Sequence, residues 1–244
     1  MGLAFGFPGL DEARLGALFG PGVSVGCADP RAPASDLWPE EAAALHQAVS
    51  RRRGEFAAGR RAARGALAAL GRAACAIPVA PTRAPLWPAG IIGSISHCDR
   101  IAVAAVAPAG RFRALGLDVE PDEPLPEGLG ETICRPEEMH WIARAPQQVQ
   151  GRLGRLIFSA KEALFKAQFP LTGVWLDFAD IALRLHHGAV ATAASGAGAF
   201  TARLTRAAGG FAPGHVFEGK FATSGGFVLT AVTIPVARAA ITGE

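Results

Sequence analysis

The chain has 244 residues, half of them hydrophobic, and a formal net charge of +3 at pH 7. This length and apolar content can bury the core of one large domain or of two small ones, and they exclude disorder of the chain as a whole. The modest net charge excludes a histone-like polycation, although residues 51–72 hold seven arginines against the single acid Glu55. We therefore expect any anion-binding site to be local.

The cysteines and the apolar segments indicate a cytoplasmic protein. The four cysteines are scattered, with no C-x-x-C pair and no metal-ligand spacing, which fits thiols in a reducing compartment. The apolar N-terminus lacks a basic leader and reaches Asp11 and Glu12 early, so it is a poor export signal. Nowhere do 18 apolar residues run together. We expect no spanning helix, and neither a membrane nor a nucleic acid as partner.

The N-terminal part of the chain contains a connection followed by helical segments. Residues 22–38 are punctuated by Pro and Asp, and Pro39 then lies near the first turn of a helix. The alanine-rich residues 55–70 predict a further helix of at least two or three turns. On it Arg60 and Arg64 are four residues apart and share a face. Such a pair by itself is most often part of a solvated helix face.

Short apolar runs after residue 90 predict a sheet. Residues 91–97 and 101–107 are β-type runs, and a Pro-Ala-Gly turn leads to a further run over residues 112–120. A loop rich in Pro, Gly and acids follows over residues 121–130. These segments indicate that the first helical part of the chain packs on strands that come directly after it.

The C-terminal part repeats this order of helix and then sheet. Residues 135–168 read as helical with a break over 145–150, and Gly-rich turns separate the strand-like segments that follow. Four such segments are expected, the last two joined by a TSGG hairpin: 181–185, 200–205, 215–221 and 227–236. Helix followed by sheet thus occurs once on each side of residue 114.

Two carboxylates on the strand-like run are candidate metal ligands. Asp118 and Glu120 are two residues apart, so both project from one face of an extended chain, next to Gly116. Two close acids repel unless a cation lies between them, and Mg²⁺ prefers oxygen ligands of this kind. The simpler interpretation is that both acids are solvated at the end of a strand. The spacing alone does not decide between these interpretations.

The segment FSAKEALFKAQ, residues 158–168, holds two of the three lysines of the chain. Lys161 and Lys166 flank Glu162, and an ammonium at both places suggests a chemical requirement that a guanidinium does not meet. An ordinary surface ion pair is the alternative, because Glu162 and Lys166 have the favourable i to i+4 order. Against it, the aromatic and aliphatic neighbours of these residues would bury much of the helix.

Spacing excludes three patterns of nucleophilic catalysis. His97 and Cys98 are neighbours on an extended run and point to opposite faces, so they do not act on one another directly. GSISH is not the G-x-S-x-G elbow, and Ser159 lies two rather than three residues before Lys161, so no S-x-x-K motif is present. Without another signal, His97 would be a structural histidine of the sheet.

The segments FAAGRRAAR, RAPLWPAGIIGSISH, LGLDVEP and FSAKEALFKA occur in this order along the chain. As a set they resemble the Sfp-type superfamily of 4′-phosphopantetheinyl transferases, and among these most resemble the branch of enterobactin synthetase component D. The resemblance covers roughly residues 40–178. It implies an α+β fold of two similar halves related by a pseudo-twofold axis, with the active site in the cleft between them. We place the halves at residues 1–114 and 115–244 and expect a monomer.

The resemblance also implies a reaction. The phosphopantetheine arm of coenzyme A would pass to a serine of an apo acyl or peptidyl carrier protein, with release of 3′,5′-ADP. Carriers of nonribosomal peptide, polyketide and siderophore synthesis are the partners that it implies. Two alternatives stay open: a non-catalytic module of the same fold that binds coenzyme A or a carrier, and another magnesium-dependent phosphoryl-transfer enzyme.

The same resemblance assigns roles to the acids and the bases of these segments. Asp118, Glu120 and Glu162 would hold Mg²⁺, with Mn²⁺ as an alternative. Glu162 would help to deprotonate the attacking serine, and Lys166 would donate to the departing phosphate, so that Glu162, Lys166 and Asp118 are the implied catalytic residues. Arg83 stands where relatives often carry a Lys or Arg. The residues that would bind coenzyme A are Arg52, Arg60, Arg64, Arg83, Ser96, His97, Lys161 and Lys166.

Overall fold

The computed structural model describes residue 10 and residues 12–186 and 196–236. Its helices are α1 (Glu12–Phe19), α2 (Pro39–Ala42), α3 (Ser50–Ala69), α4 (Leu129–Ile133), α5 (Pro136–Ala143) and α6 (Gln147–Thr172), with the 3-10 turns η1 (Ala43–Leu45) and η2 (Phe178–Asp180). Its strands are β1 (Ser24–Ala28), β2 (Ile91–His97), β3 (Ala102–Pro108), β4 (Phe112–Pro121), β5 (Ile181–Leu185), β6 (Ala197–Leu204), β7 (Val216–Ser224) and β8 (Phe227–Pro235).

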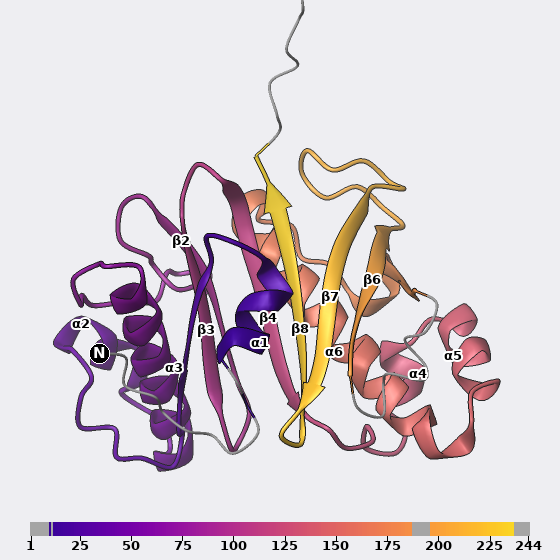
Figure 1. Cartoon of the computed structure of the whole chain (residues 1–244), viewed down its shortest axis with the longest axis horizontal. Helices are drawn as coiled ribbons and strands as arrows, with labels where there is room; N and C mark the ends of the chain where they lie inside the picture. The colour runs from indigo at the N-terminus through magenta and orange to yellow at the C-terminus, as the bar shows by residue number, and fades with distance from the viewer. Residues whose placement is uncertain (1–9, 11, 187–195, 237–244) are drawn as a thin grey trace, which may run out of the picture.

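The strands form two antiparallel sheets that stand side by side (Figure 1). The first sheet has the strand order β1-β3-β2, and the second has the order β4-β8-β7-β6-β5. Strand β2 of the first sheet packs beside β4 of the second. This mixture of helices and two sheets confirms the α+β class expected from the sequence.

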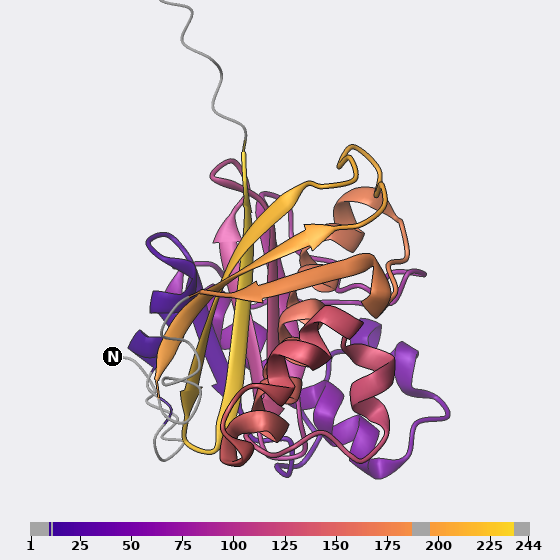
Figure 2. The same ribbon diagram turned by 90° about the vertical axis from the view of Figure 1, so that its right-hand side faces the viewer.

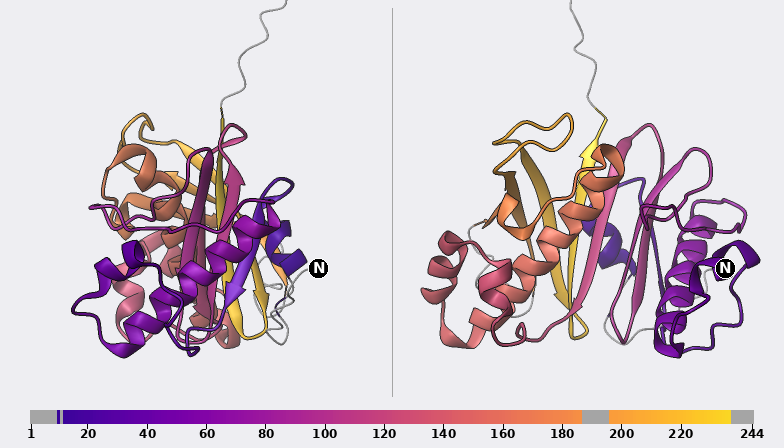
Figure 3. Two further views of the ribbon diagram at one scale, coloured as in Figure 1. Left: turned by 90° about the vertical axis from the view of Figure 1, so that its left-hand side faces the viewer. Right: turned by 180° about the vertical axis from the view of Figure 1, so that it is seen from behind.

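One long helix packs on each sheet. Helix α3 lies on β1 and β3, and its alanines form a core with Ile77 and Val106. Helix α6 lies on β4 and β8 and crosses the second sheet when the molecule is seen from behind (Figure 3). The shorter helices α4 and α5 pack on α6 and lie low on the same side of the molecule (Figure 2). The pairing of one long helix with one sheet fits the expected pair of similar halves, and the boundary near residue 114 stays a prediction.

The N-terminal segment and the connections differ in part from expectation. Residues 22–38 are not a connection throughout, because β1 pairs with β3 from Ser24 to Ala28. Helix α1 was not expected, and it packs on β7 and β8. The break between α5 and α6 comes at residues 144–146, since α6 begins at Gln147. The TSGG hairpin is confirmed by the pairing of Ser224 with Phe227.

Gly116 allows helix α6 to approach strand β4 closely. A Cβ atom at Gly116 would lie 1.9 Å from the carbonyl oxygen of Ala163, which is backbone of α6. The helix that carries Glu162 and Lys166 would therefore have to move away from the strand that carries Asp118.

We expect Gly116→Ala to lower the free energy of unfolding by about 1–3 kcal/mol, because the added methyl group overpacks the contact between helix and strand. Chemical denaturation measures this change. Gly65 on α3 is the matched control, because a Cβ there meets no atom within 4 Å. Gly65→Ala should be neutral or stabilising. Equal stability of the two variants would contradict this account of the contact.

Candidate active site

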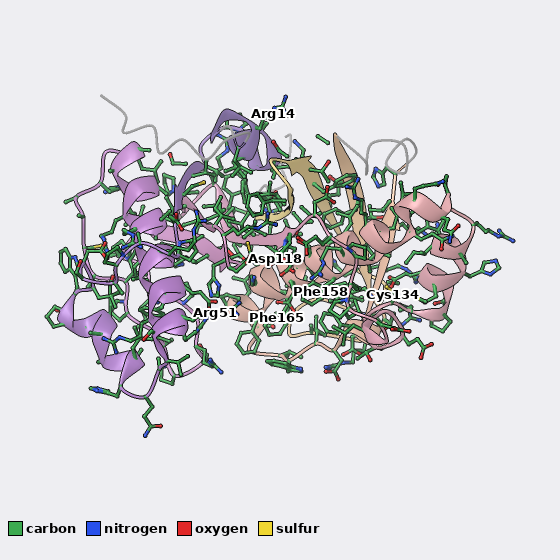
Figure 4. All side chains as sticks on the ribbon, turned by 90° about the horizontal axis from the view of Figure 1, so that it is seen from below. Arg14, Arg51, Asp118, Cys134, Phe158 and Phe165 are labelled. Carbon is green, nitrogen blue, oxygen red and sulfur yellow. The ribbon has the colours of Figure 1, made fainter. Side chains whose placement is uncertain are left out.

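Strand β4 places Asp118 between the two halves. Its side chain is buried, and in Figure 4 it is labelled near the middle of the molecule, where the purple and pink parts of the chain meet. Asp118 Oδ1 accepts hydrogen bonds from Lys166 Nζ at 2.6 Å and from Ser96 Oγ at 2.8 Å. Asp118 Oδ2 is buried and has no hydrogen-bond partner among the described residues. A buried acceptor of this kind requires a donor or a cation that comes with a ligand.

Glu120 lies two residues further along the same face of β4. Its Oε2 accepts a hydrogen bond from Arg155 Nη1 of helix α6 at 2.8 Å. Burial, with a smaller contribution from the charge of Asp118, raises the pKa of Glu120 to about 7. Glu120 is therefore not the solvated strand-end acid of the simpler interpretation. Arg155 was not identified from the sequence, although its place two turns before Glu162 puts both on one face of a helix.

Helix α6 carries Glu162 and Lys166 toward Asp118. Its apolar face packs into the core of the second sheet, and Glu162 and Lys166 are half-buried at the margin of that face. The ion partner that the structure shows for Lys166 is Asp118, at 2.6 Å, rather than a surface pair with Glu162. Burial raises the pKa of Glu162, which Lys166 lowers and Asp118 raises. Glu162 thus lies within electrostatic reach of both residues.

The three predicted metal ligands are near one another but are not assembled into a metal site. Within the described parts of the chain, no three His, Cys, Asp or Glu side chains are grouped so that they would hold a metal ion. Lys166 occupies Asp118 Oδ1 and Arg155 occupies Glu120 Oε2. The unpartnered Asp118 Oδ2 and the carboxylate donors fit a hard divalent cation. The magnesium site stays a proposal.

Four of the predicted phosphate-binding residues line one basic pocket of the first half. This cavity of about 350 Å³ lies between α3, β2 and the 79–85 turn, and Arg52, Arg60, Arg83 and His97 line it. Arg60 is fixed by a hydrogen bond from Nε to the Ile77 carbonyl at 2.9 Å. Burial lowers the pKa of Arg60 to about 10, which leaves it charged at neutral pH. Three guanidinium groups, an imidazole and the carboxylate of Glu55 line this cavity, so its lining is net positive and suits an anion.

His97 is a neutral acceptor in this pocket. Its Nε2 atom lies 2.8 Å from Arg52 Nη1, and the guanidinium has only donors, so Nε2 accepts. Burial lowers the pKa of His97, and the charge of Arg52 lowers it further. Arg83 lies on the opposite side in a left-handed conformation with φ of 69°, which is unusual for a residue other than Gly. Both His97 and Arg83 line the pocket, and their contact with coenzyme A stays a prediction.

Three of the expected coenzyme A contacts are held by other protein groups in the structure. Lys161 is 1% exposed. Its Nζ atom donates to Glu138 Oε2 at 2.7 Å and to the carbonyls of Ile133 at 2.9 Å and Phe178 at 3.0 Å, so all three N–H groups are used. Burial lowers the pKa of Lys161 and Glu138 opposes this. These contacts favour a structural role for Lys161, and its contact with a phosphate stays a prediction.

Arg64 and Ser96 are the other two of these residues. Arg64 lies outside the basic pocket because its guanidinium binds the buried Glu41 at 2.9 Å and also contacts Asp36. Ser96 is 5% exposed, and its hydroxyl donates to Asp118 and accepts from Lys166 Nζ at 3.0 Å and Val119 N at 3.3 Å. Both side chains have protein partners in this structure, and their contacts with coenzyme A stay predictions.

An apolar cavity beside Lys166 was not expected from the sequence. It has a volume of about 450 Å³ and neighbours the basic pocket, since Arg83, Pro85 and Ile95 line both. Phe165 and Phe169 stack in its wall, and Trp175 meets Phe165 edge-on with ring centroids 4.9 Å apart. Trp175 is 64% exposed, which is unusual for so large an apolar side chain. The sequence held one signal of this cavity, because Phe165 and Phe169 are four residues apart and share a face of the helix.

Comparison with known proteins identifies the family. The model of the 4′-phosphopantetheinyl transferase N-terminal domain matches residues 40–107, and that of the 4′-phosphopantetheinyl transferase superfamily matches residues 114–217. The chain is 41% identical over 216 residues to 4′-phosphopantetheinyl transferase Svp of Streptomyces mobaraensis, covering 84% of this chain and 81% of that protein. It is 39% identical over 199 residues to 4′-phosphopantetheinyl transferase Npt of Nocardia iowensis, covering 80% and 87%.

A more distant relative matches about half of the chain. Enterobactin synthase component D of Escherichia coli K12 is 36% identical over 133 residues, which cover 54% of this chain and 62% of that protein. The chain belongs to the 4′-phosphopantetheinyl transferase superfamily, as the four sequence segments indicated. Among the described helices, none combines the length and apolar character that crossing a membrane requires.

Proposed function

We propose that this chain transfers the 4′-phosphopantetheine arm of coenzyme A to a serine of an apo carrier protein and releases 3′,5′-ADP. The observation that carries this proposal is the contact between the basic pocket and the acid cluster. Consecutive residues of β2 belong to the two sites, since Ser96 binds Asp118 and His97 lines the basic pocket. One coenzyme A molecule, which has a 3′-phosphate and a pyrophosphate, requires both kinds of site close together.

The charges and cavities support one orientation of coenzyme A. The basic pocket of Arg52, Arg60, Arg83 and His97 would bind the 3′-phosphate, because that group carries the charge furthest from the pyrophosphate. Lys166 would contact the pyrophosphate from the acid cluster. The pantetheine arm would lie in the apolar cavity at Trp175, where its amide-linked carbon chain gains from burial.

Asp118, Glu120 and Glu162 would hold Mg²⁺, with Mn²⁺ as the alternative. When it is bound, the ion supplies positive charge to the pyrophosphate oxygens. The unpartnered Asp118 Oδ2 supports this assignment. Glu120 needs to be ionised to serve as a ligand, and its pKa of about 7 means that protons compete with the cation below neutral pH. The concentration of Mg²⁺ needed for half-maximal activity should therefore rise as the pH falls.

The chain's own residues supply the proton transfers. Glu162 would accept the proton of the carrier serine, and its pKa, raised by burial, makes it a stronger base than an exposed glutamate. The serine oxygen then bonds to the phosphorus that bears the pantetheine arm, and the bond from that phosphorus to the bridging oxygen breaks. Lys166 would stabilise the charge that develops on the departing phosphate. Positioning and electrostatics carry the reaction, as in other phosphoryl transfers.

The test of the proposal is transfer to a panel of apo carriers from peptide, polyketide and siderophore synthesis. Intact-mass measurement should show a gain of one phosphopantetheine group on the carrier, with an equal amount of 3′,5′-ADP released. Binding of coenzyme A without any mass gain on any carrier would instead indicate the non-catalytic module. Release of a different nucleotide would indicate another phosphoryl transfer. Gel filtration and cell fractionation test the associated proposals of a monomer in the cytoplasm.

If the basic pocket binds the 3′-phosphate, its residues should distinguish coenzyme A from 3′-dephospho-coenzyme A. Arg60→Gln should raise the KM for coenzyme A by roughly tenfold to a hundredfold, because it removes a charge-assisted contact with the 3′-phosphate. The KM for 3′-dephospho-coenzyme A, which lacks that phosphate, should not change. Arg52→Gln, at the more exposed end of the pocket, should give the same pattern if Arg60→Gln folds poorly. Steady-state kinetics with both nucleotides measures these values.

Arg72→Gln is the control for this prediction, because Arg72 is exposed beyond the end of α3 and lies outside the pocket. It makes the same change in net charge and should leave both KM values as in the wild type. An equal rise for the two nucleotides in Arg60→Gln would show that the pocket does not bind the 3′-phosphate.

A further inference from the structure

Two serines of β2 connect the halves of the molecule. Strands β2 and β4 are edge strands of different sheets, yet they pack side by side. The backbone N–H of Leu117 donates to Ser94 Oγ at 3.1 Å, and that of Val119 donates to Ser96 Oγ at 3.3 Å. Ser94 is 4% exposed. Side-chain hydroxyls thus accept the bonds that carbonyl groups accept between the strands of one sheet.

The two contacts follow a regular pattern. Ser94 and Ser96 are two residues apart and so lie on one face of β2, and their partners Leu117 and Val119 are also two residues apart. The contacts advance in the same direction along both strands. Buried backbone N–H groups need acceptors, so a shift of β4 along β2 would leave these groups of β4 unsatisfied. The pair therefore specifies one register between the halves.

This register joins the two parts of the active site. Ser96 also donates to Asp118 Oδ1 and accepts from Lys166 Nζ, while its neighbour His97 lines the basic pocket. The single hydrogen and both lone pairs of the Ser96 hydroxyl are then used. Ser94 lines the apolar cavity beside Lys166, and its hydroxyl accepts a hydrogen bond from the backbone N–H of Leu117 across the two strands.

We propose that Ser94 is a positioning residue that sets the distance between the basic pocket and the acid cluster. The proposal rests on the proposed function, because the two sites are then the ends of one coenzyme A molecule. A ligand that spans both halves gains affinity only if the halves hold its two charged groups at the correct separation. A ligand that lacks the 3′-phosphate does not depend on that separation.

The test compares Ser94→Ala with the wild type for coenzyme A and for 3′-dephospho-coenzyme A. We expect kcat/KM for coenzyme A to fall by about tenfold to a hundredfold, the effect of a small misplacement. For the dephospho compound the fall should be several times smaller, so the preference for coenzyme A decreases. Calorimetric binding of both nucleotides gives the same comparison without any transfer.

Ser159→Ala is the matched control. Ser159 is buried, and its hydroxyl lies 2.9 Å from Thr230 Oγ1, a contact between α6 and β8 inside the second half. Its loss should lower the thermal midpoint and leave the nucleotide preference unchanged. If Ser94→Ala does not fold, Ser94→Cys, which retains a weaker acceptor, is used for the same comparison.

The proposal would be overturned by a Ser94 variant that keeps the nucleotide preference of the wild type, whether kcat/KM is unchanged for both nucleotides or falls equally for both. Absence of transfer by the wild-type protein would contradict the proposed function instead. In that case the binding comparison still decides the role of Ser94.

Discussion

Replacing Glu162 by glutamine is expected to lower kcat for transfer by about 10²–10⁴-fold, the usual contribution of a general base. Glutamine keeps the size of the side chain and removes the proton acceptor. Coenzyme A affinity measured without a divalent cation should change little, because the basic pocket of Arg52, Arg60 and His97 is untouched. Single-turnover rates and calorimetric binding separate these two effects.

The pH profile gives a second readout for Glu162. Burial raises its pKa, so activity should fall as the pH falls through that value and the carboxylate gains a proton. In Glu162→Gln, measured with the divalent cation in excess so that protonation of Glu120 does not limit the rate, this acid limb should be lost. Glu218→Gln is the control, because Glu218 is exposed on β7 and should leave rate and profile unchanged. A nearly wild-type kcat in Glu162→Gln would contradict the role of Glu162 as the general base.

Replacing Lys161 by methionine is expected to lower the free energy of unfolding by about 3–5 kcal/mol, because it leaves the buried Glu138 charge without its partner. The contact is 2.7 Å long, and both side chains are almost fully buried. Lys161 also holds Ile133 and Phe178 through their carbonyl groups. Chemical denaturation at a pH near neutrality measures the loss.

A double variant distinguishes a structural pair from a phosphate contact. In Lys161→Met/Glu138→Gln the neutral amide still offers an oxygen to the backbone N–H of Leu183, which now binds Glu138 Oε1 at 2.7 Å. We expect the double variant to recover part of the stability lost by Lys161→Met and to bind coenzyme A like the wild type. A stable double variant with weakened coenzyme A binding would restore Lys161 to the phosphate site.

The different positions of the two lysines follow from helix geometry that the sequence already contains. Five residues turn an α-helix by roughly 140°, so Lys161 and Lys166 cannot serve the same site, whereas Glu162 and Lys166 are separated by roughly 40°. The resemblance treated both lysines as phosphate contacts. Helical periodicity applied to the same segment favours Lys166 beside Glu162 and turns Lys161 to the opposite side, where Glu138 lies.

The arginines of α3 show what periodicity does not predict. Arg60 and Arg64 share a helix face, yet only Arg60 lines the basic pocket. The guanidinium of Arg64 is directed by its ion pair with Glu41, which is fully buried and belongs to helix α2. Long side chains are directed by tertiary partners, and these partners are far apart in sequence. The same limit explains why Arg155 and Ser94 were not identified.

Most strands were predicted from their β-like composition, and β1 was missed. Segments rich in β-branched and aliphatic residues gave β2, β3, β4 and β8 nearly to the residue. Strand β1 is only five residues long and lies in a stretch punctuated by Pro and Asp, which was interpreted as a connection. In the structure, a Cβ at Gly26 would lie 2.3 Å from the Ala62 carbonyl, so the glycine admits helix α3. That reason appears only when the helix is in place.

The most direct test of the account is a crystal structure of the chain with coenzyme A and Mg²⁺. The account predicts the 3′-phosphate within hydrogen-bonding distance of Arg52, Arg60 and His97, with Lys166 at the pyrophosphate. It also predicts the metal on Asp118, Glu120 and Glu162 and the arm beside Trp175. Coenzyme A bound away from β2 and β4, or a metal that leaves Asp118 Oδ2 unpartnered, would contradict it.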